Sequence, residues 1–179
     1  MSEDKHLLKL LRHGDRRALH RLYEKYRTDL YTVALSLIQD VHTAEDCLQD
    51  VFVRLVEVAA DLEIRRNLKG YLISSVANRA RDRLRKKTKL SERTENIGCS
   101  VCATDPVKIL IDREESARVF NTLMRLPYDQ REVFVLHVQA GMKFREIAEL
   151  QSVSVKTAIS RYRYGIEKLQ ALLERDDAK

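Results

Sequence analysis

Apolar residues recur every three or four positions along most of this chain, which is the spacing of amphipathic α-helices. A short leading helix is predicted within residues 1–14, which contain LLKLLRHG and end at Gly14. A second helix is expected after its N-cap Asp15, with apolar positions from Leu19 to Ile38. A third is expected to begin at Thr43, because T-A-E-D has the pattern of a capping box. The first third of the chain therefore predicts three helices.

The rest of the chain divides at an irregular segment. A fourth helix is predicted from Tyr71 to Lys87, after a turn that ends at Gly70. Residues 88–112 are polar and lack a sustained period, which is typical of a linker. Beyond them two more helices are expected, the first with an apolar stripe of Val119, Phe120, Leu123 and Leu126. The pattern predicts an all-α fold of two small helical domains, 1–87 and 113–179, joined by a linker over 88–112.

Residues 144–173 form the most regular part of the pattern. A short amphipathic helix, a polar break and a longer basic helix follow one another, with Ser154 as the expected N-cap of the second helix. This order predicts a helix-turn-helix, whose second helix offers side chains to the major groove of DNA. An ordinary helical hairpin with a solvated basic face is the alternative interpretation.

The second helix of this pair has two contrasting faces. Its expected buried face consists of Val155, Ile159, Tyr162, Ile166, Leu169 and Leu173. Its expected outer face consists of Lys156, Thr157, Ser160, Arg161, Tyr164 and Lys168. Gly165 lies inside the helix and costs about 1 kcal/mol of helix propensity.

Composition supports helices and gives no sign of catalysis. Five Gly and two Pro leave the helices almost uninterrupted, and 44% hydrophobic residues suffice for a core. Neither a signal peptide nor an apolar stretch of membrane-spanning length is visible, so we expect a cytoplasmic protein. We also find no phosphate-binding glycine loop and no catalytic constellation, and therefore expect neither an enzyme nor a cofactor.

The three cysteines give no clear metal site. Cys99 and Cys102 form a C-x-x-C pair, which is half of a zinc site or a redox pair, but no second half follows. We therefore expect no bound metal. A thiol or metal sensor that uses Cys47, Cys99 and Cys102 stays open as a third interpretation.

Charge is distributed unevenly along the sequence. Residues 40–53 hold four carboxylates and no Lys or Arg, although the chain has a formal net charge of +6. Carboxylates favour a helix N-terminus, but this acidic patch continues past the first turn, which suggests a basic protein partner. Residues 79–93 hold eight basic residues against two acidic ones. A one-sided basic run of this kind favours contacts with nucleic-acid phosphates.

The order of these segments resembles a known family. LHRLYEKYRTDLYTVALSLI followed by AEDCLQDVFVRLVE is similar to region two of bacterial sigma factors, and NLKGYLISSVANRARDRLRKK resembles its promoter-melting part. LPYDQREVFVLHVQAGMKFREIAELQSVSVKTAISRYRYGIEKLQALL is similar to region four. The short chain resembles the extracytoplasmic-function (ECF) subfamily. This resemblance implies a sigma factor that binds core RNA polymerase and directs promoter-specific transcription initiation, with promoter DNA contacted by both domains.

The resemblance also implies roles for individual residues. The clamp of the largest polymerase subunit would bind Glu45, Asp46, Gln49 and Asp50. The minus-ten element would contact Asn67, Tyr71, Asn78, Arg79, Asp82 and Arg85, with a flipped base held partly by the loop 65–69. The minus-thirty-five element would contact Lys156, Thr157, Ser160, Arg161 and Arg163.

Two further expectations come from the resemblance. Family members are usually held inactive by an anti-sigma factor, so we expect such a partner. Many also have Gly where this chain has Gln151, a turn position that favours positive φ. The alternative function is a freestanding helix-turn-helix regulator with a helical effector domain. It does not account for the acidic and basic patches of the N-terminal half.

Overall fold

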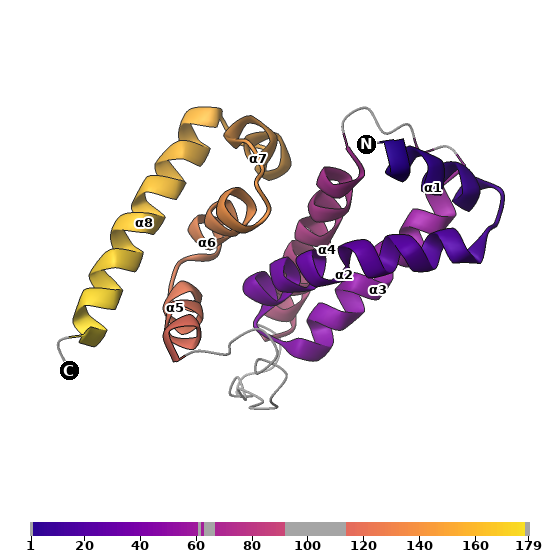
Figure 1. Ribbon diagram of the computed structural model, residues 1–179. Helices are drawn as coiled ribbons and strands as arrows, with labels where there is room; N and C mark the ends of the chain where they lie inside the picture. Colours follow the sequence, from indigo (N-terminus) through magenta and orange to yellow (C-terminus); the bar gives the residue numbers. More distant parts are fainter. Residues whose placement is uncertain (1, 61, 63–66, 92–113, 178–179) are drawn as a thin grey trace.

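The computed structural model describes residues 2–60, 62, 67–91 and 114–177, and every regular element within them is helical (Figure 1). The predicted all-α fold is confirmed. The N-terminal half contains α1 (Ser2–Arg12), α2 (Arg16–Ile38), α3 (Val41–Val58) and α4 (Leu68–Ser91). The C-terminal half contains α5 (Glu114–Met124), α6 (Tyr128–Phe134), the π-helix η2 (Val135–Gln139), α7 (Phe144–Gln151) and α8 (Val155–Asp177).

Helix α2 is the centre of the molecule. It packs against α1, α3 and α4 on one side, and its C-terminal end reaches η2, α5 and α6 (Figure 1). Its fully buried side chains include Leu22, Leu30 and Leu37. Each leucine removed from water in this way contributes about 1.5–3 kcal/mol. The wide apolar face that the sequence predicts for this helix is therefore what holds the N-terminal half together.

Side-chain caps fix where the N-terminal helices begin. Asp15 caps α2 as predicted, and its Oδ1 accepts a hydrogen bond from the Arg17 backbone N at 2.8 Å. The predicted start of α3 at Thr43 is wrong. Asp40 is the N-cap instead and accepts from the Thr43 backbone N at 2.7 Å, so the helix begins at Val41. An aspartate is at least as good a cap as a threonine, and here it stands closer to the preceding helix.

The start of α4 also differs from the prediction. The helix begins at Leu68, three positions before Tyr71, because the Asn67 Oδ1 accepts from the Gly70 backbone N at 2.5 Å and caps it. At the other end the helix runs through Ser91, so residues 88–91 of the expected linker are helical. The remainder of that segment lies outside the described residues.

The turn between α7 and α8 corrects one expectation about Gln151. That residue is helical, and the left-handed residue is Ser152, with φ 55°. The left-handed conformation costs a serine a modest amount of free energy, because its Cβ is crowded by the backbone, and a glycine would avoid this cost. Ser154 caps α8 as predicted, since its Oγ accepts from the Thr157 backbone N at 3.0 Å.

The expected buried face of α8 is confirmed at Leu169, and Tyr162 and Leu173 also pack against the core, but it is wrong at Val155 and Ile159. The buried residues of the helix are Ala158, Gly165, Leu169 and Leu172, whereas Val155 and Ile159 are 42% and 45% exposed. The small residues face the rest of the domain, and Gly165 lies against Gln130 of α6. Because α8 approaches α6 through its small residues, Val155 and Ile159 are turned toward solvent. On α5, Val119 is likewise 43% exposed, so the predicted stripe is wrong at that position.

The two halves contact each other along one end of α2. The buried Arg131 of α6 donates from Nη2 to the Leu37 backbone O at 3.0 Å. Ser36 donates to the Gln139 Oε1 at 3.2 Å, and Gln39 donates from Nε2 to the Met124 backbone O at 3.4 Å. Burial lowers the pKa of Arg131, but the carbonyl that it meets replaces part of the lost hydration.

Candidate functional site

The predicted acidic patch forms one surface on α3. Glu45, Asp46 and Gln49 are exposed and Asp50 is half-buried, while Cys47 and Leu48 face the core. The structure thus brings the four expected polymerase contacts together. We refer to Glu45, Asp46, Gln49 and Asp50 as the acidic surface.

A basic side chain from the neighbouring helix borders the acidic surface. Arg83 of α4 lies 3.2 Å from the Asp50 Oδ2 through Nη2 and 3.8 Å from the Asp46 Oδ2 through Nη1. The hydrogen bond to Asp50 is the main cause of the raised pKa of Arg83. Arg83 is therefore paired with the acidic surface, although its place in the basic run of the sequence suggested a contact with DNA.

The predicted minus-ten residues fall into two groups on α4. The first group lies on the outer face of the helix, where Asn78, Arg79, Asp82 and Arg85 are all exposed above the buried Ala77 and Ala80. We call these four the α4 surface. The second group is at the start of the helix, where Asn67 is the N-cap and Tyr71 is half-buried. Residues 65 and 66 of the expected base-binding loop lie outside the described residues.

The predicted minus-thirty-five residues also separate. Lys156, Thr157 and Arg163 are exposed on α8, and Ser160 is half-buried beside them. These four residues form the recognition surface. Arg161 points elsewhere, with Nη2 2.7 Å from the Asp129 Oδ2 and Nη1 donating to the Gln151 Oε1 at 2.8 Å. It joins α8 to α6 and α7, so its guanidinium is engaged inside the domain.

An aromatic cluster supports the helix-turn-helix from behind. The His137 ring stacks on Phe144 of α7 with centroids 4.2 Å apart and meets Tyr162 of α8 edge-on at 5.0 Å. Phe134 also stacks on Tyr162, at 6.3 Å. The His137 Nδ1 lies 2.8 Å from the Met142 backbone O. These contacts fix the angle between α7 and α8 and hence the direction in which the recognition surface faces.

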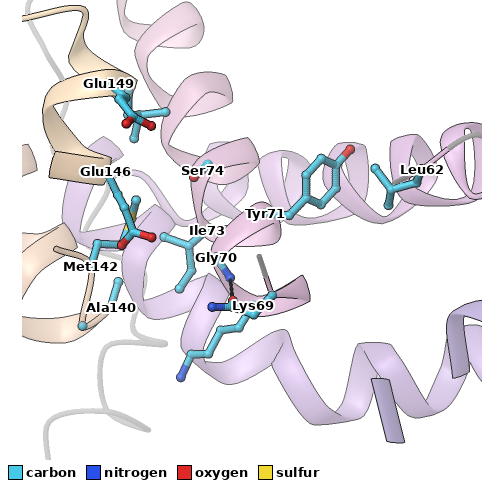
Figure 2. A pocket seen from close by; sticks show the side chains of 13 residues that line it. Leu62, Lys69, Gly70, Tyr71, Ile73, Ser74, Ala140, Met142, Glu146 and Glu149 are labelled. Carbon is cyan, nitrogen blue, oxygen red and sulfur yellow. Dashed lines mark hydrogen bonds between the residues drawn. The ribbon is translucent and has the colours of Figure 1, made fainter. Parts of the chain in front are cut away.

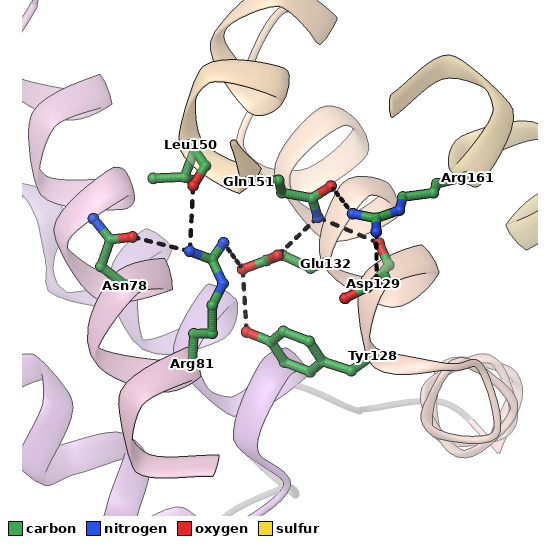
Figure 3. A network of polar contacts seen from close by, with 8 residues as sticks. All are labelled: Asn78, Arg81, Tyr128, Asp129, Glu132, Leu150, Gln151 and Arg161. Atoms are coloured by element: carbon green, nitrogen blue, oxygen red, sulfur yellow. Dashed lines mark hydrogen bonds and ion pairs between the residues drawn. The ribbon is translucent and has the colours of Figure 1, made fainter. Parts of the chain in front are cut away.

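A buried carboxylate connects the helix-turn-helix to α4 (Figure 3). Glu132 of α6 is 1% exposed and accepts at Oε1 from the Arg81 Nη2 at 2.8 Å and from the Tyr128 hydroxyl at 3.1 Å. Its Oε2 accepts from the Gln151 Nε2 at 2.7 Å. Burial and the Glu132 charge raise the pKa of Tyr128, which therefore stays a donor. Arg81 also donates to the Leu150 backbone O at 3.2 Å.

A cavity of about 460 Å³ opens between the start of α4 and the α7 side of the C-terminal half (Figure 2). Its lining includes Asn67 and Tyr71 from the start of α4, and Met142, Glu146 and Glu149 from the C-terminal half. The Tyr71 ring points toward Leu62 and away from Met142 and Glu146 (Figure 2).

The structure bears on the other candidate sites within the residues that it describes. In that part of the chain no three His, Cys, Asp or Glu side chains are grouped as metal ligands. Cys47 is buried, and burial raises the pKa of its thiol. Cys99 and Cys102 fall outside the described residues. None of the described helices is long and apolar enough to cross a membrane.

Sequence reasoning did not find the residues that join the two halves. Glu132 stands near the start of a helix, where an acidic residue needs no other explanation. Its partner Arg81 is 51 positions away and belongs to a basic run. Val155 and Ile159 fitted the apolar period of α8, so nothing in the pattern marked them as exposed.

Both halves match models of known protein families. The model of Sigma-70 region 2 matches residues 22–90, and that of Sigma-70, region 4 matches residues 116–169. A freestanding regulator would lack the first of these regions, so the alternative function has no support.

Among curated relatives, the RNA polymerase sigma factor CnrH of Cupriavidus metallidurans is 31% identical over 175 residues, with 93% of this chain and 92% of the relative covered. The ECF RNA polymerase sigma factor SigW of Bacillus subtilis is 25% identical over 179 residues, with 93% and 94% covered.

Two solved structures have a similar fold, and one of them is also a relative in sequence. The structure of CnrH in complex with the cytosolic domain of CnrY has a TM-score of 0.69 and 28% identity, covering 97% of this chain and 99% of that chain. The sigma factor RpoE of Bartonella quintana, in complex with the anti-sigma factor NepR, has a TM-score of 0.71 and 23% identity, covering 86% and 97%. The latter likeness concerns the fold alone. The chain belongs to the ECF subfamily of bacterial RNA polymerase sigma factors, which bind core RNA polymerase and direct promoter-specific transcription initiation.

Proposed function

We propose that three surfaces of this sigma factor each bind a different partner: core polymerase, the minus-ten element and the minus-thirty-five element. A domain over residues 1–87 binds core polymerase through the acidic surface and the minus-ten element through α4. A domain over 113–179 contacts the minus-thirty-five element through the recognition surface, and residues 88–112 link the two. The observation that carries this proposal is the opposite charge of two exposed faces on adjacent helices: carboxylates on α3, and Arg79 and Arg85 on α4. One protein partner and one nucleic-acid partner account for both.

The acidic surface is suited to a basic protein partner, which we take to be the clamp of the largest polymerase subunit. Arg83 holds the Asp50 and Asp46 carboxylates in place, which reduces the conformational entropy that these two side chains lose on binding. Charged groups at the rim of an interface mainly govern the rate and orientation of docking.

The α4 surface is suited to a melted minus-ten element. Arg79 and Arg85 offer charge to phosphates, and Asn78 and Asp82 offer hydrogen bonds to base edges. At the start of the helix, Tyr71 has a ring on which a flipped base could stack, which is worth about 1–3 kcal/mol per base. Asn67 would keep its capping bond to Gly70 and use its amide N–H groups for DNA.

The recognition surface is suited to duplex DNA. The capped N-terminus of α8 carries the exposed Lys156 and Thr157, and Ser160 and Arg163 follow on the next two turns. This is the part of a recognition helix that enters the major groove. Arg161 takes part mainly by positioning α8, because Asp129 and Gln151 already engage its guanidinium.

We further propose that the protein adds no catalytic chemistry of its own and acts in the cytoplasm with the polymerase. An anti-sigma factor is the expected regulator. Support comes from the similar folds of CnrH and RpoE, each solved in a complex with another protein.

Reconstitution with core polymerase tests the first assignment. Glu45→Lys should weaken binding to core by about tenfold or more, because it reverses a charge in a charged interface. Glu45 is preferable to Asp50 for this purpose, since Asp50 also holds Arg83. Glu57→Lys is the matched control, an exposed residue of the same helix outside the acidic surface. Equal affinities of wild type and Glu45→Lys for core would contradict the assignment.

A further inference from the structure

Two large apolar side chains are exposed at the start of the recognition helix. Val155 and Ile159 are 42% and 45% exposed, and they lie one turn apart on the same side of α8. Single exposed aliphatic residues are common on protein surfaces. Here the two residues form a pair in the first two turns of a helix that is proposed to enter DNA.

The pair borders the recognition surface. Each residue of an α-helix advances by about 100°, so Ile159 is about 40° from Arg163 and about 60° from Lys156. The centre of the buried face, around Ala158 and Gly165, is about 100–120° from Ile159 and about 60–80° from Val155. A partner that contacts Lys156 and Arg163 would therefore also meet Ile159, with Val155 next to it.

Folding does not explain these two residues. Valine and isoleucine lose rotamer freedom in a helix and have lower helix propensity than alanine or lysine. Burial normally compensates for this loss, but here much of each side chain remains in water. The same stiffness is an advantage in binding, because a side chain with one preferred χ1 loses little entropy when a partner immobilises it.

We propose that Val155 and Ile159 are specificity-determining residues that contact thymine methyl groups in the minus-thirty-five element. The C5-methyl of thymine is the apolar group that the major groove displays, and aliphatic side chains distinguish thymine through it. Lys156, about one turn before Ile159, and Arg163, about one turn after it, supply phosphate contacts that fix the register. This proposal rests on the proposed role of the recognition surface.

Replacing thymine by deoxyuridine removes this methyl and leaves base pairing intact. The probe is a duplex library, randomised in the upstream element and selected with the reconstituted holoenzyme at one fixed salt concentration. Each selected thymine is then changed singly to deoxyuridine. At one or two positions, this change should lower the affinity of the wild-type holoenzyme for the duplex about fourfold, which is the factor expected for burying one methyl-sized group. Val155→Ala or Ile159→Ala should bind the thymine duplex more weakly and become insensitive to deoxyuridine at the matching position.

Both variants should fold, because alanine is the better helix former and neither residue is in the core. Val119→Ala is the matched control, since Val119 is an exposed valine on α5 and should keep the wild-type response to deoxyuridine. If wild type and both variants are equally sensitive to deoxyuridine, this inference is wrong, and the proposed function is unaffected. If the wild-type holoenzyme selects a minus-ten sequence but no upstream sequence, the proposed role of α8 fails, and the inference fails with it.

Discussion

Glu132 lies where almost no solvent reaches it, and side chains of α4, α6 and α7 donate hydrogen bonds to it. A buried carboxylate that loses its cationic partner costs about 3–5 kcal/mol. The sequence could not predict this arrangement, because helical periodicity reports which face is buried but not which distant side chain meets it. Gln151 is a similar case. Its amide serves Glu132 and Arg161 at once, a role that its place at the end of a helix does not indicate.

Gly165 offers a direct test of packing at a single position. It lies on the buried face of α8, and an added Cβ would be 3.5 Å from the Gln130 Cβ, an ordinary van der Waals contact. Gly165→Ala should therefore raise the free energy of unfolding by about 0.5–1 kcal/mol, the gain in helix propensity, as measured by urea denaturation. Gly141→Ala is the control and should destabilise by about 1 kcal/mol or more, because Gly141 has φ 68°. A less stable Gly165→Ala would show that α8 needs the glycine for closer packing.

At the scale of elements, the apolar pattern predicted where helices occur and missed their ends and one orientation. Helix α3 starts two residues early because Asp40 caps it, and α4 starts three residues early because Asn67 does. In both cases a polar side chain just before the apolar run decides the boundary. The orientation of α8 was missed for a different reason. Its period is correct, but packing through Ala158 and Gly165 shifts the buried face away from Val155 and Ile159.

The cap of α8 gives a prediction at this scale. The Ser154 Oγ accepts from the Thr157 backbone N at 3.0 Å and lies 2.8 Å from the Thr157 Oγ1. Ser154→Ala should lower the free energy of unfolding by about 1 kcal/mol and weaken discrimination of the upstream element, because the first turn frays. Ser154→Asp should restore stability, since aspartate is also a good cap. If both variants are as stable as wild type in urea, the cap does not hold this turn.

At the scale of the whole molecule, the two halves lie closer together than the two promoter elements that they are proposed to contact. The minus-ten and minus-thirty-five elements are about 85 Å apart along B-DNA, at 3.4 Å per base pair. In this structure the Arg81 Nη1 of α4 is 3.2 Å from the Leu150 backbone O of α7, the first helix of the helix-turn-helix. Both elements can therefore be bound at once only if the two halves separate.

This compact arrangement could not be predicted from the sequence. The residues that join the halves are few, and each has an adequate local interpretation: Ser36 within an apolar face, Gln139 near a turn, Arg131 within a charged helix. The two family-like segments predicted two domains, and the contact between them is a property of the folded chain. Its energy must be modest if core polymerase and promoter are to open it, since a ligand shifts such an equilibrium only by its differential affinity.

Arg81→Glu tests whether the ion pair with Glu132 closes the molecule. The new carboxylate would then lie beside the Glu132 carboxylate, which is only 1% exposed. Because two buried carboxylates without a cation repel each other and cannot be hydrated, the two halves should separate. Small-angle X-ray scattering of the free protein should give a clearly larger radius of gyration for Arg81→Glu than for wild type. Arg83→Glu is the control on the same helix. Its partners Asp46 and Asp50 are in the N-terminal half, so Arg83→Glu should have the same radius of gyration as wild type. Superimposable scattering curves for wild type and Arg81→Glu would mean that the apolar and backbone contacts around α2 close the molecule without the ion pair.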